Sequence, residues 1–233
     1  MNEHVLVIGG TRGTGWRIAG LLLKQGYRVR ALARDEGHAK TLLSSAIDVV
    51  GGDITRPDTL PSAMRDIDHI VFTAGVTKRP AGEGLIIETV FEGVKNTLAA
   101  AREGGVEGRF LYMTAIGVTS RSPGAALLNL VKRNTLHWRR RAEDAIRASG
   151  LAYTIVRAGI LTNAPGGRRA IDVSQNDYPL ALKYRIGRAD VAEAIVMALK
   201  YPNLRWTTFE VVWGRGVERE SWDVLFGRLR PDD

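Results

Sequence analysis

The chain has 233 residues, of which 45% are hydrophobic and 25% are charged, and its formal net charge is +8. This length and balance are typical of one globular domain with a full hydrophobic core. No cysteine is present, which excludes disulfides, thiolate metal sites and cysteine nucleophiles. No apolar run approaches the length of a bilayer crossing, and no charged leader precedes an apolar segment at the start. We therefore expect a cytoplasmic protein without a membrane partner.

The positive charge fits a solvated surface, a phosphate-bearing small ligand or nucleic acid. Basic residues gather in 132–144 and 166–169, but neither segment carries interleaved aromatic residues or a nucleic-acid motif. We therefore expect no nucleic-acid partner. The four histidines are scattered without ligand spacing, so we expect no metal site.

Short β-rich runs alternate with helical patterns along the whole chain. Because strands that alternate with helices build βαβ units, the pattern predicts a doubly wound (Rossmann) α/β fold with helices on both faces of a largely parallel sheet. We expect a single domain over residues 1–233, with about seven strands and a small C-terminal subregion on the substrate side. The predicted strands are 5–8, 27–33, 48–52, 69–75, 109–114, 153–159 and 208–214.

Helical patterns lie between these strands. Segment 15–26 has an apolar face and ends at Gly26, and segment 90–106 ends at a glycine pair. A third helix is expected to begin near Asp190 as its N-cap. Residues 220–233 indicate a terminal amphipathic helix that either caps the fold or mediates dimerisation, so the chain is expected to be a monomer or a homodimer.

Residues 161–187 interrupt the alternation, since they are rich in loop-forming residues and follow a strand. Loops at the carboxyl ends of parallel strands build the ligand crevice of such folds. This segment is therefore a candidate substrate lid, with an ordinary surface excursion as the alternative.

Three glycines follow the first strand directly and precede the first helix. Gly9 permits a tight turn, Gly13 allows the backbone to approach a pyrophosphate, and Gly15 allows close packing of helix and strand. The first helix would point its free N–H groups and positive dipole end at that anion. In this context the spacing predicts a dinucleotide site at the switch point between the first and fourth strands.

The end of the second strand distinguishes the two nicotinamide dinucleotides. NAD requires a carboxylate there for the ribose hydroxyls, whereas the 2′-phosphate of NADP requires positive charge. Arg34 occupies this place, and Arg12 in the glycine turn is expected to reach the same phosphate. Asp35 follows immediately, so NAD stays open, but NADP(H) is the favoured cofactor.

The chain resembles the atypical short-chain dehydrogenase/reductase superfamily, in particular its NmrA-like and biliverdin-reductase-B-like branch. The resemblance is carried by GGTRGTG (9–15), GDIT (52–55), FTAG (72–75), WRRRAEDAIRASGLAYTIVRAG (138–159) and GRADVAEAIVMAL (187–199). It implies that Asp53 and Ile54 lie near the adenine and that Thr73, Ala74 and Gly75 line the cofactor. The candidate cofactor residues are Gly9, Thr11, Arg12, Gly13, Thr14, Gly15, Arg34, Asp53, Ile54, Thr73, Ala74, Gly75 and Arg139.

The catalytic Ser-Tyr-Lys triad of short-chain dehydrogenases is absent at the matching positions. The resemblance places Ala115 at the serine, Thr135 at the tyrosine and Arg139 at the lysine. A threonine hydroxyl is no proton donor of tyrosine's acidity. The remaining candidates are Thr114 as a substrate-contacting hydroxyl and His137 as an acid, and Arg139 is expected to bind a ribose.

Three functions remain open at this point. In the first, the protein is an NADPH-dependent reductase of a small organic molecule, whose proton comes from solvent or an unidentified group. In the second, it binds NADP(H) without turnover and signals redox state to a regulatory protein partner. In the third, it is an isomerase or lyase that uses the nucleotide structurally.

Overall fold

The computed structural model describes residues 3–76, 82–120 and 122–232. Its centre is an eight-stranded sheet in the order β3-β2-β1-β4-β5-β6-β10-β8. Neighbouring strands are parallel except β10 and β8, which are antiparallel. The strands of this sheet are β1 (His4–Ile8), β2 (Arg28–Ala33), β3 (Asp48–Gly51), β4 (His69–Phe72), β5 (Phe110–Ala115), β6 (Tyr153–Ala158), β8 (Ile171–Ser174) and β10 (Thr207–Trp213).

The strand order reverses between β1 and β4. The chain proceeds outward from β1 to β2 and β3, and then returns to place β4 on the other side of β1. The crevice outside the carboxyl ends of these two strands is the expected ligand position in an open parallel sheet. The predicted Rossmann architecture and its switch point are therefore confirmed.

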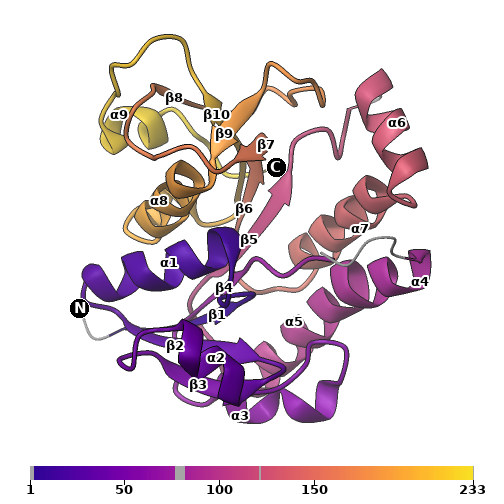
Figure 1. The fold of residues 1–233 in the computed structure, drawn as a ribbon, viewed down its shortest axis with the longest axis vertical. Helices are drawn as coiled ribbons and strands as arrows, with labels where there is room; N and C mark the ends of the chain where they lie inside the picture. The colour runs from indigo at the N-terminus through magenta and orange to yellow at the C-terminus, as the bar shows by residue number, and fades with distance from the viewer. Residues whose placement is uncertain (1–2, 77–81, 121, 233) are drawn as a thin grey trace.

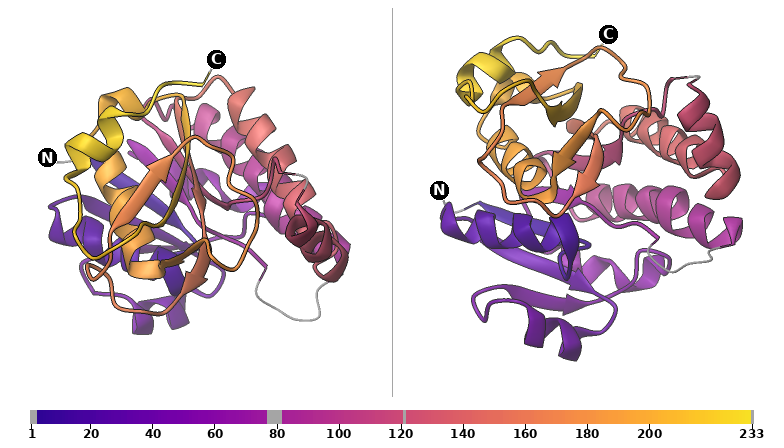
Figure 2. Two further views of the ribbon diagram at one scale, coloured as in Figure 1. Left: turned by 90° about the horizontal axis from the view of Figure 1, so that it is seen from above. Right: turned by 45° about the horizontal axis from the view of Figure 1, so that its top comes forward.

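Helices cover both faces of the sheet (Figure 1). One face packs against α1, α2, α8 and α9, and the other packs against α3, α5 and α7. The orange helix α8 lies beside the indigo helix α1 (Figure 2), whereas β10 and β8 form the opposite edge of the sheet from β2 and β3. The helices are α1 (Gly13–Lys24), α2 (Glu36–Leu42), α3 (Pro61–Met64), α4 (Glu83–Ile86), α5 (Gly93–Glu103), α6 (Pro123–Val131), α7 (Thr135–Arg147), α8 (Arg188–Ala198) and α9 (Trp222–Gly227).

Segment 161–187 contains more regular structure than its composition predicts. β8 (Ile171–Ser174) joins the edge of the main sheet, which therefore has eight strands instead of about seven. β7 (Ile160–Thr162) and β9 (Arg185–Gly187) form a separate parallel pair. These strands are only three or four residues long. Each of these strands forms because it pairs with a strand elsewhere in the chain. The amino-acid pattern of segment 161–187 alone shows mainly glycines and prolines and therefore predicts a loop.

Two predicted helix boundaries are wrong. The N-cap of α8 is Gly187, and Asp190 lies inside the first turn with a buried carboxylate that accepts hydrogen bonds from Gly167 N and Trp213 Nε1. The C-terminal helix ends at Gly227 instead of running through 220–233, of which residue 233 lies outside the described residues. Hydrogen bonds to distant residues hold the Asp190 carboxylate inside the fold. The residues after Gly227 are held by side-chain hydrogen bonds to the sheet instead of by helical ones.

The C-terminal helix caps the fold. Leu225, Phe226 and Leu229 are buried in the core that α1 and α8 share. Beyond it, Asp232 accepts hydrogen bonds from Thr208 N at 2.8 Å and from the Tyr153 hydroxyl at 2.9 Å. The apolar face of α9 is therefore buried within this chain.

None of the helices in the described part of the chain has the length and apolar character that a bilayer crossing demands.

Candidate cofactor and active site

The glycine turn has the conformation that its sequence predicts. Gly9 has φ +86° and Gly13 has φ +60°, in the left-handed region that glycine adopts without strain. A Cβ on Gly9 would lie 2.8 Å from Ala74 N, and one on Gly15 would overlap the carbonyl oxygen of Gly9. The glycine turn therefore packs directly against Ala74.

Thr73 fixes the two crossing segments at the switch point. Its backbone N–H and its Oγ1 both donate to the carbonyl oxygen of Ile8, at 2.8 and 3.0 Å. Since Ile8 ends β1 and Thr73 follows β4, these bonds hold the two strand ends together. The structure thus brings Gly9, Gly15, Thr73 and Ala74 into one cluster, as the sequence predicts.

The start of α1 presents further groups at this turn. Thr14 is buried, and its Oγ1 has no hydrogen-bond partner in the described part of the chain. Arg12 is exposed at the N-cap position, and Thr11 is half-buried. A buried hydroxyl without a partner at a helix N-terminus fits an anionic ligand there.

Two adjacent charged residues, Arg34 and Asp35, follow β2 and differ in their contacts. Asp35 is the N-cap of α2, and its Oδ1 accepts a hydrogen bond from His38 N at 2.9 Å. Arg34 is exposed and makes no ion pair within residues 3–76, 82–120 and 122–232. The carboxylate is therefore engaged locally, while the guanidinium is free.

The two candidate adenine contacts have local structural roles. Asp53 Oδ1 accepts hydrogen bonds from Thr55 N at 2.9 Å and from Thr55 Oγ1 at 3.0 Å, which is an Asx-type turn. Ile54 is buried, and a Cβ on Gly93 would lie 2.8 Å from its Cδ1. Asp53 keeps its second carboxylate oxygen available, whereas the Ile54 side chain belongs to the core.

Arg139 belongs to α7, and its guanidinium lies beside Gly75 in the segment that follows β4. A Cβ on Gly75 would be 3.4 Å from Arg139 Nη2, so α7 delivers this guanidinium to the crevice. Thr114, at the end of β5, is 3% exposed. Burial raises the pKa of the nearby Tyr112 hydroxyl to about 12, and Arg139 acts against this rise. Tyr112 is therefore a buried, protonated phenol that sequence reasoning did not select.

His137 is exposed in the first turn of α7. Its ring packs edge-on against Trp138, with centroids 5.2 Å apart. No interaction joins His137 to Thr114 among the residues that the structure describes. The two catalytic candidates therefore do not form a paired acid site in this conformation.

Arg157 connects segment 161–187 to the sheet and to α7. Its Nη2 donates to Glu143 Oε2 at 2.8 Å, and its Nη1 donates to Asp177 Oδ1 at 2.6 Å. Thr119 Oγ1, in the loop after β5, donates to the same Asp177 oxygen at 2.6 Å. One guanidinium thus joins the candidate lid, a helix and a strand.

Leu180 packs the same segment onto the loop after β5. It contacts the small cluster of Val118, Ala125 and Leu136. A Cβ on Gly124 would overlap the Leu180 carbonyl oxygen, so the two segments are in close contact. Residues 177–180 therefore pack against the loop that follows β5 and against the start of α6.

Glu210 is a buried carboxyl group beside this network. Its neighbours across β6 and β5 are Arg157 and Thr114, which the strand register places in one row. Burial raises the pKa of Glu210 to about 7, although Tyr178 N, which donates to it, and Arg157 lower it. In the sequence, Arg157 and Glu210 stand out as charged residues inside otherwise apolar strands. The sequence analysis did not use this signal.

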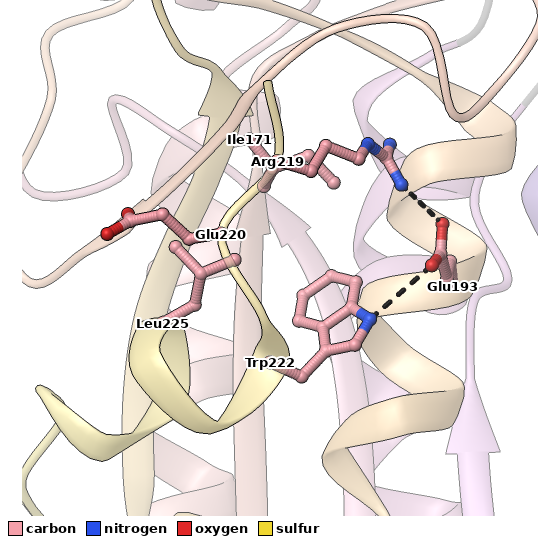
Figure 3. A pocket seen from close by; sticks show the side chains of 6 residues that line it. All are labelled: Ile171, Glu193, Arg219, Glu220, Trp222 and Leu225. Atoms are coloured by element: carbon pink, nitrogen blue, oxygen red, sulfur yellow. Dashed lines mark hydrogen bonds and ion pairs between the residues drawn. The ribbon is translucent and has the colours of Figure 1, made fainter. Parts of the chain in front are cut away.

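Two cavities lie elsewhere. One of about 180 Å³ lies between β8, α8 and α9 (Figure 3), where Glu193 accepts hydrogen bonds from Arg219 at 2.8 Å and from Trp222 at 3.4 Å. The polar atoms of Glu193, Arg219 and Trp222 are thus hydrogen-bonded to one another, and these bonds hold the start of α9 against α8. A wider cavity of about 610 Å³ is lined by α1, the segment after α2, Gly166 and α8. Neither cavity is lined by a predicted site residue.

Comparison with known proteins identifies the family. A family model described as NAD(P)H-binding matches residues 9–202. The chain belongs to this NAD(P)H-binding family. The cofactor class and the family resemblance expected from the sequence are therefore confirmed.

Individual relatives cover most of the chain. It is 29% identical to sanguinarine reductase of Eschscholzia californica, over 87% of this chain and 86% of that protein. It is 32% identical to an uncharacterized chloroplastic protein of Arabidopsis thaliana, over 98% of this chain and 83% of that protein. A protein from Bacillus halodurans, provisionally named an NAD-dependent epimerase/dehydratase, superposes with a TM-score of 0.78 at 26% identity, covering 93% of this chain and 96% of that one.

Proposed function

We propose that this protein is an NADPH-dependent reductase of a small organic substrate. The observation that carries the NADP preference is the end of β2, where Asp35 caps α2 and Arg34 stays free. A carboxylate engaged in capping is a poor partner for ribose hydroxyls, whereas a free guanidinium suits a 2′-phosphate. The likeness to a plant reductase over most of both chains supports the reaction type.

The residues of the crevice fit the cofactor. The glycine turn, the first N–H groups of α1 and the unpartnered Thr14 hydroxyl would hold the pyrophosphate. Arg34 and Arg12 would hold the 2′-phosphate, and Arg139 beside Gly75 would hold a ribose. Small residues at 73–75 leave room for a flat ring.

When bound, the nicotinamide supplies the hydride. The chain's own task is to orient the substrate, exclude water and allow a proton to reach the reduced atom. Residues 161–187, fixed by Arg157 and Leu180, would form the cover over the substrate. Thr114 would contact the substrate after a small opening of this cover, and the proton would come from solvent or from the exposed His137.

NADPH oxidation, followed by absorbance, tests the proposal. The substrate panel contains quinones, flavins, enones, aldehydes, ketones and sanguinarine, and NADPH affinity is measured on the same sample. Turnover of one class, with NADPH preferred over NADH, is the expected result. A chain that binds neither nucleotide would overturn the proposal.

A non-catalytic NADP(H) sensor is the second candidate. It is favoured by Ala115, Thr135 and Arg139 at the three triad positions and by the burial of Thr114. Tight NADPH binding without turnover of any compound in the panel would favour this function. The next experiment would then compare proteins that bind the NADP+ form with those that bind the NADPH form.

A further inference from the structure

Arg188 approaches the glycine turn from a part of the chain distant in sequence. It is the first residue of α8, which packs along α1. A Cβ on Gly13 would lie 3.9 Å from Arg188 Nε, so the guanidinium stands beside the residue expected to approach the pyrophosphate. The sequence analysis used this segment for a helix cap and for the family resemblance, and it assigned no role to Arg188.

The charge of Arg188 is not neutralised by the protein. Its Nη1 donates to Asn163 Oδ1 at 2.9 Å, and no carboxylate pairs with it in the described ranges. Asp190, two residues later, is engaged instead by Arg219. A half-buried guanidinium held by a neutral amide keeps its charge available for an anion.

A second arginine strengthens the positive potential at the same turn. Arg17 Nη1 donates to the carbonyl oxygen of Gly13 at 2.9 Å, which holds this guanidinium in the first turn of α1. The start of α1 adds its own dipole and the unpartnered Thr14 hydroxyl. The turn therefore combines free N–H groups, an orphaned hydroxyl and cationic side chains on two helices.

We propose that Arg188 binds the cofactor pyrophosphate from the α8 side and that Asn163 is a positioning residue that holds its guanidinium there. This inference rests on the proposed cofactor site and adds a contact from a distant part of the sequence. Because NADH and NADPH share the pyrophosphate, Arg188 would serve both nucleotides. Arg34, by contrast, would distinguish them.

The test measures the dissociation constants of NADPH and NADH by fluorescence titration, together with thermal unfolding. Arg188→Gln is expected to weaken both nucleotides by a similar factor of about ten or more. Arg230→Gln is the matched control, because Arg230 is exposed and its side chain donates to the backbone carbonyl oxygen of Gly227, outside the proposed site. It removes the same charge and is expected to leave both constants unchanged.

Asn163 is tested with two substitutions. Asn163→Asp is nearly isosteric and would pair with Arg188, so it is expected to weaken both nucleotides more than Asn163→Ala does. A merely structural role for the amide predicts no such order, because the alanine variant loses more contacts. Unchanged unfolding temperatures would confirm that the fold is intact.

The outcomes separate the two proposals. If the unmodified protein binds neither nucleotide, the proposed function fails. If it binds NADPH and Arg188→Gln binds it equally well, the pyrophosphate contact is wrong while the proposed function stands. A loss confined to NADPH would place Arg188 at the 2′-phosphate and would also overturn the inference.

Discussion

The carboxylate of Asp35 accepts a hydrogen bond from the backbone N–H of His38 at 2.9 Å and thereby caps α2. This bond engages one oxygen of the carboxylate that would otherwise be offered to the adenosine ribose at the end of β2. The residue before it, Arg34, is exposed and makes no ion pair in the described residues. A local capping bond thus bears directly on the choice of cofactor.

Arg34→Asp is expected to weaken NADPH binding by about 10- to 100-fold, since a charge-assisted contact contributes about 1.5–3 kcal/mol. NADH binding should change little, because it carries no 2′-phosphate. Titration of both nucleotides checks this. Arg102→Asp at the end of α5 makes the same change in net charge and is the control, and equal losses for both nucleotides would contradict the NADP assignment.

Gly15→Ala is expected to disrupt the turn. The added Cβ would overlap the Gly9 carbonyl oxygen and lie 2.5 Å from Thr73 Oγ1, so the turn must shift. Both nucleotides should lose at least about tenfold in affinity, and the unfolding temperature should fall.

Gly20→Ala, in the same helix, is the matched control. Its Cβ would meet no atom within 4 Å. Alanine favours a helix over glycine by about 1 kcal/mol, so this variant should unfold about 2–4 °C higher and bind normally. Similar behaviour of the two variants would refute the close approach at Gly15.

Glu210 should make stability depend on pH. Its folded-state pKa of about 7 lies above the ordinary 4.5, so the folded state binds more protons between these values. The contribution of this carboxyl to stability is present below about pH 4.5 and is lost as the pH rises through about 7. Denaturant unfolding of the unmodified protein across this window measures the dependence.

Glu210→Gln keeps a neutral polar group at the site and should flatten that dependence. At pH 8 the variant should be more stable than the unmodified protein by an amount on the order of 1–3 kcal/mol. The exposed Glu220→Gln should not alter the pH profile. An unchanged profile in Glu210→Gln would show that another group titrates.

Arg157→Met should cost about 3–5 kcal/mol of stability, because Glu143 is fully buried and would lose its two hydrogen bonds from Arg157. Adding Glu143→Met should recover part of the loss, since the buried Glu143 carboxylate that lost its Arg157 partner would be removed, whereas Glu210 would stay buried without Arg157. Denaturation of the two single variants and the double variant measures the coupling. Additive losses would show that the pair is not coupled.

Local patterns were sufficient to predict the fold class and the position of the cofactor site. A strand, a glycine turn and a helix follow one another within residues 5–26. The conformation of each depends mainly on residues that are close to it in sequence. Gly9, Gly13 and Gly15 are specified by backbone geometry that few other residues tolerate. The first strands and the nucleotide class could therefore be predicted from the sequence.

Pairings between distant residues could not be predicted in this way. β8 is a strand because β10 pairs with it, and Asp190 is buried because Trp213 and Gly167 bond to it. The approach of Arg188 to Gly13 likewise depends on the packing of α8 along α1. The sequence by itself determined the nucleotide-binding turn, since its geometry is local. Only the tertiary structure decided which charges surround that turn and which elements segment 161–187 packs against, because burial and long-range contacts set both.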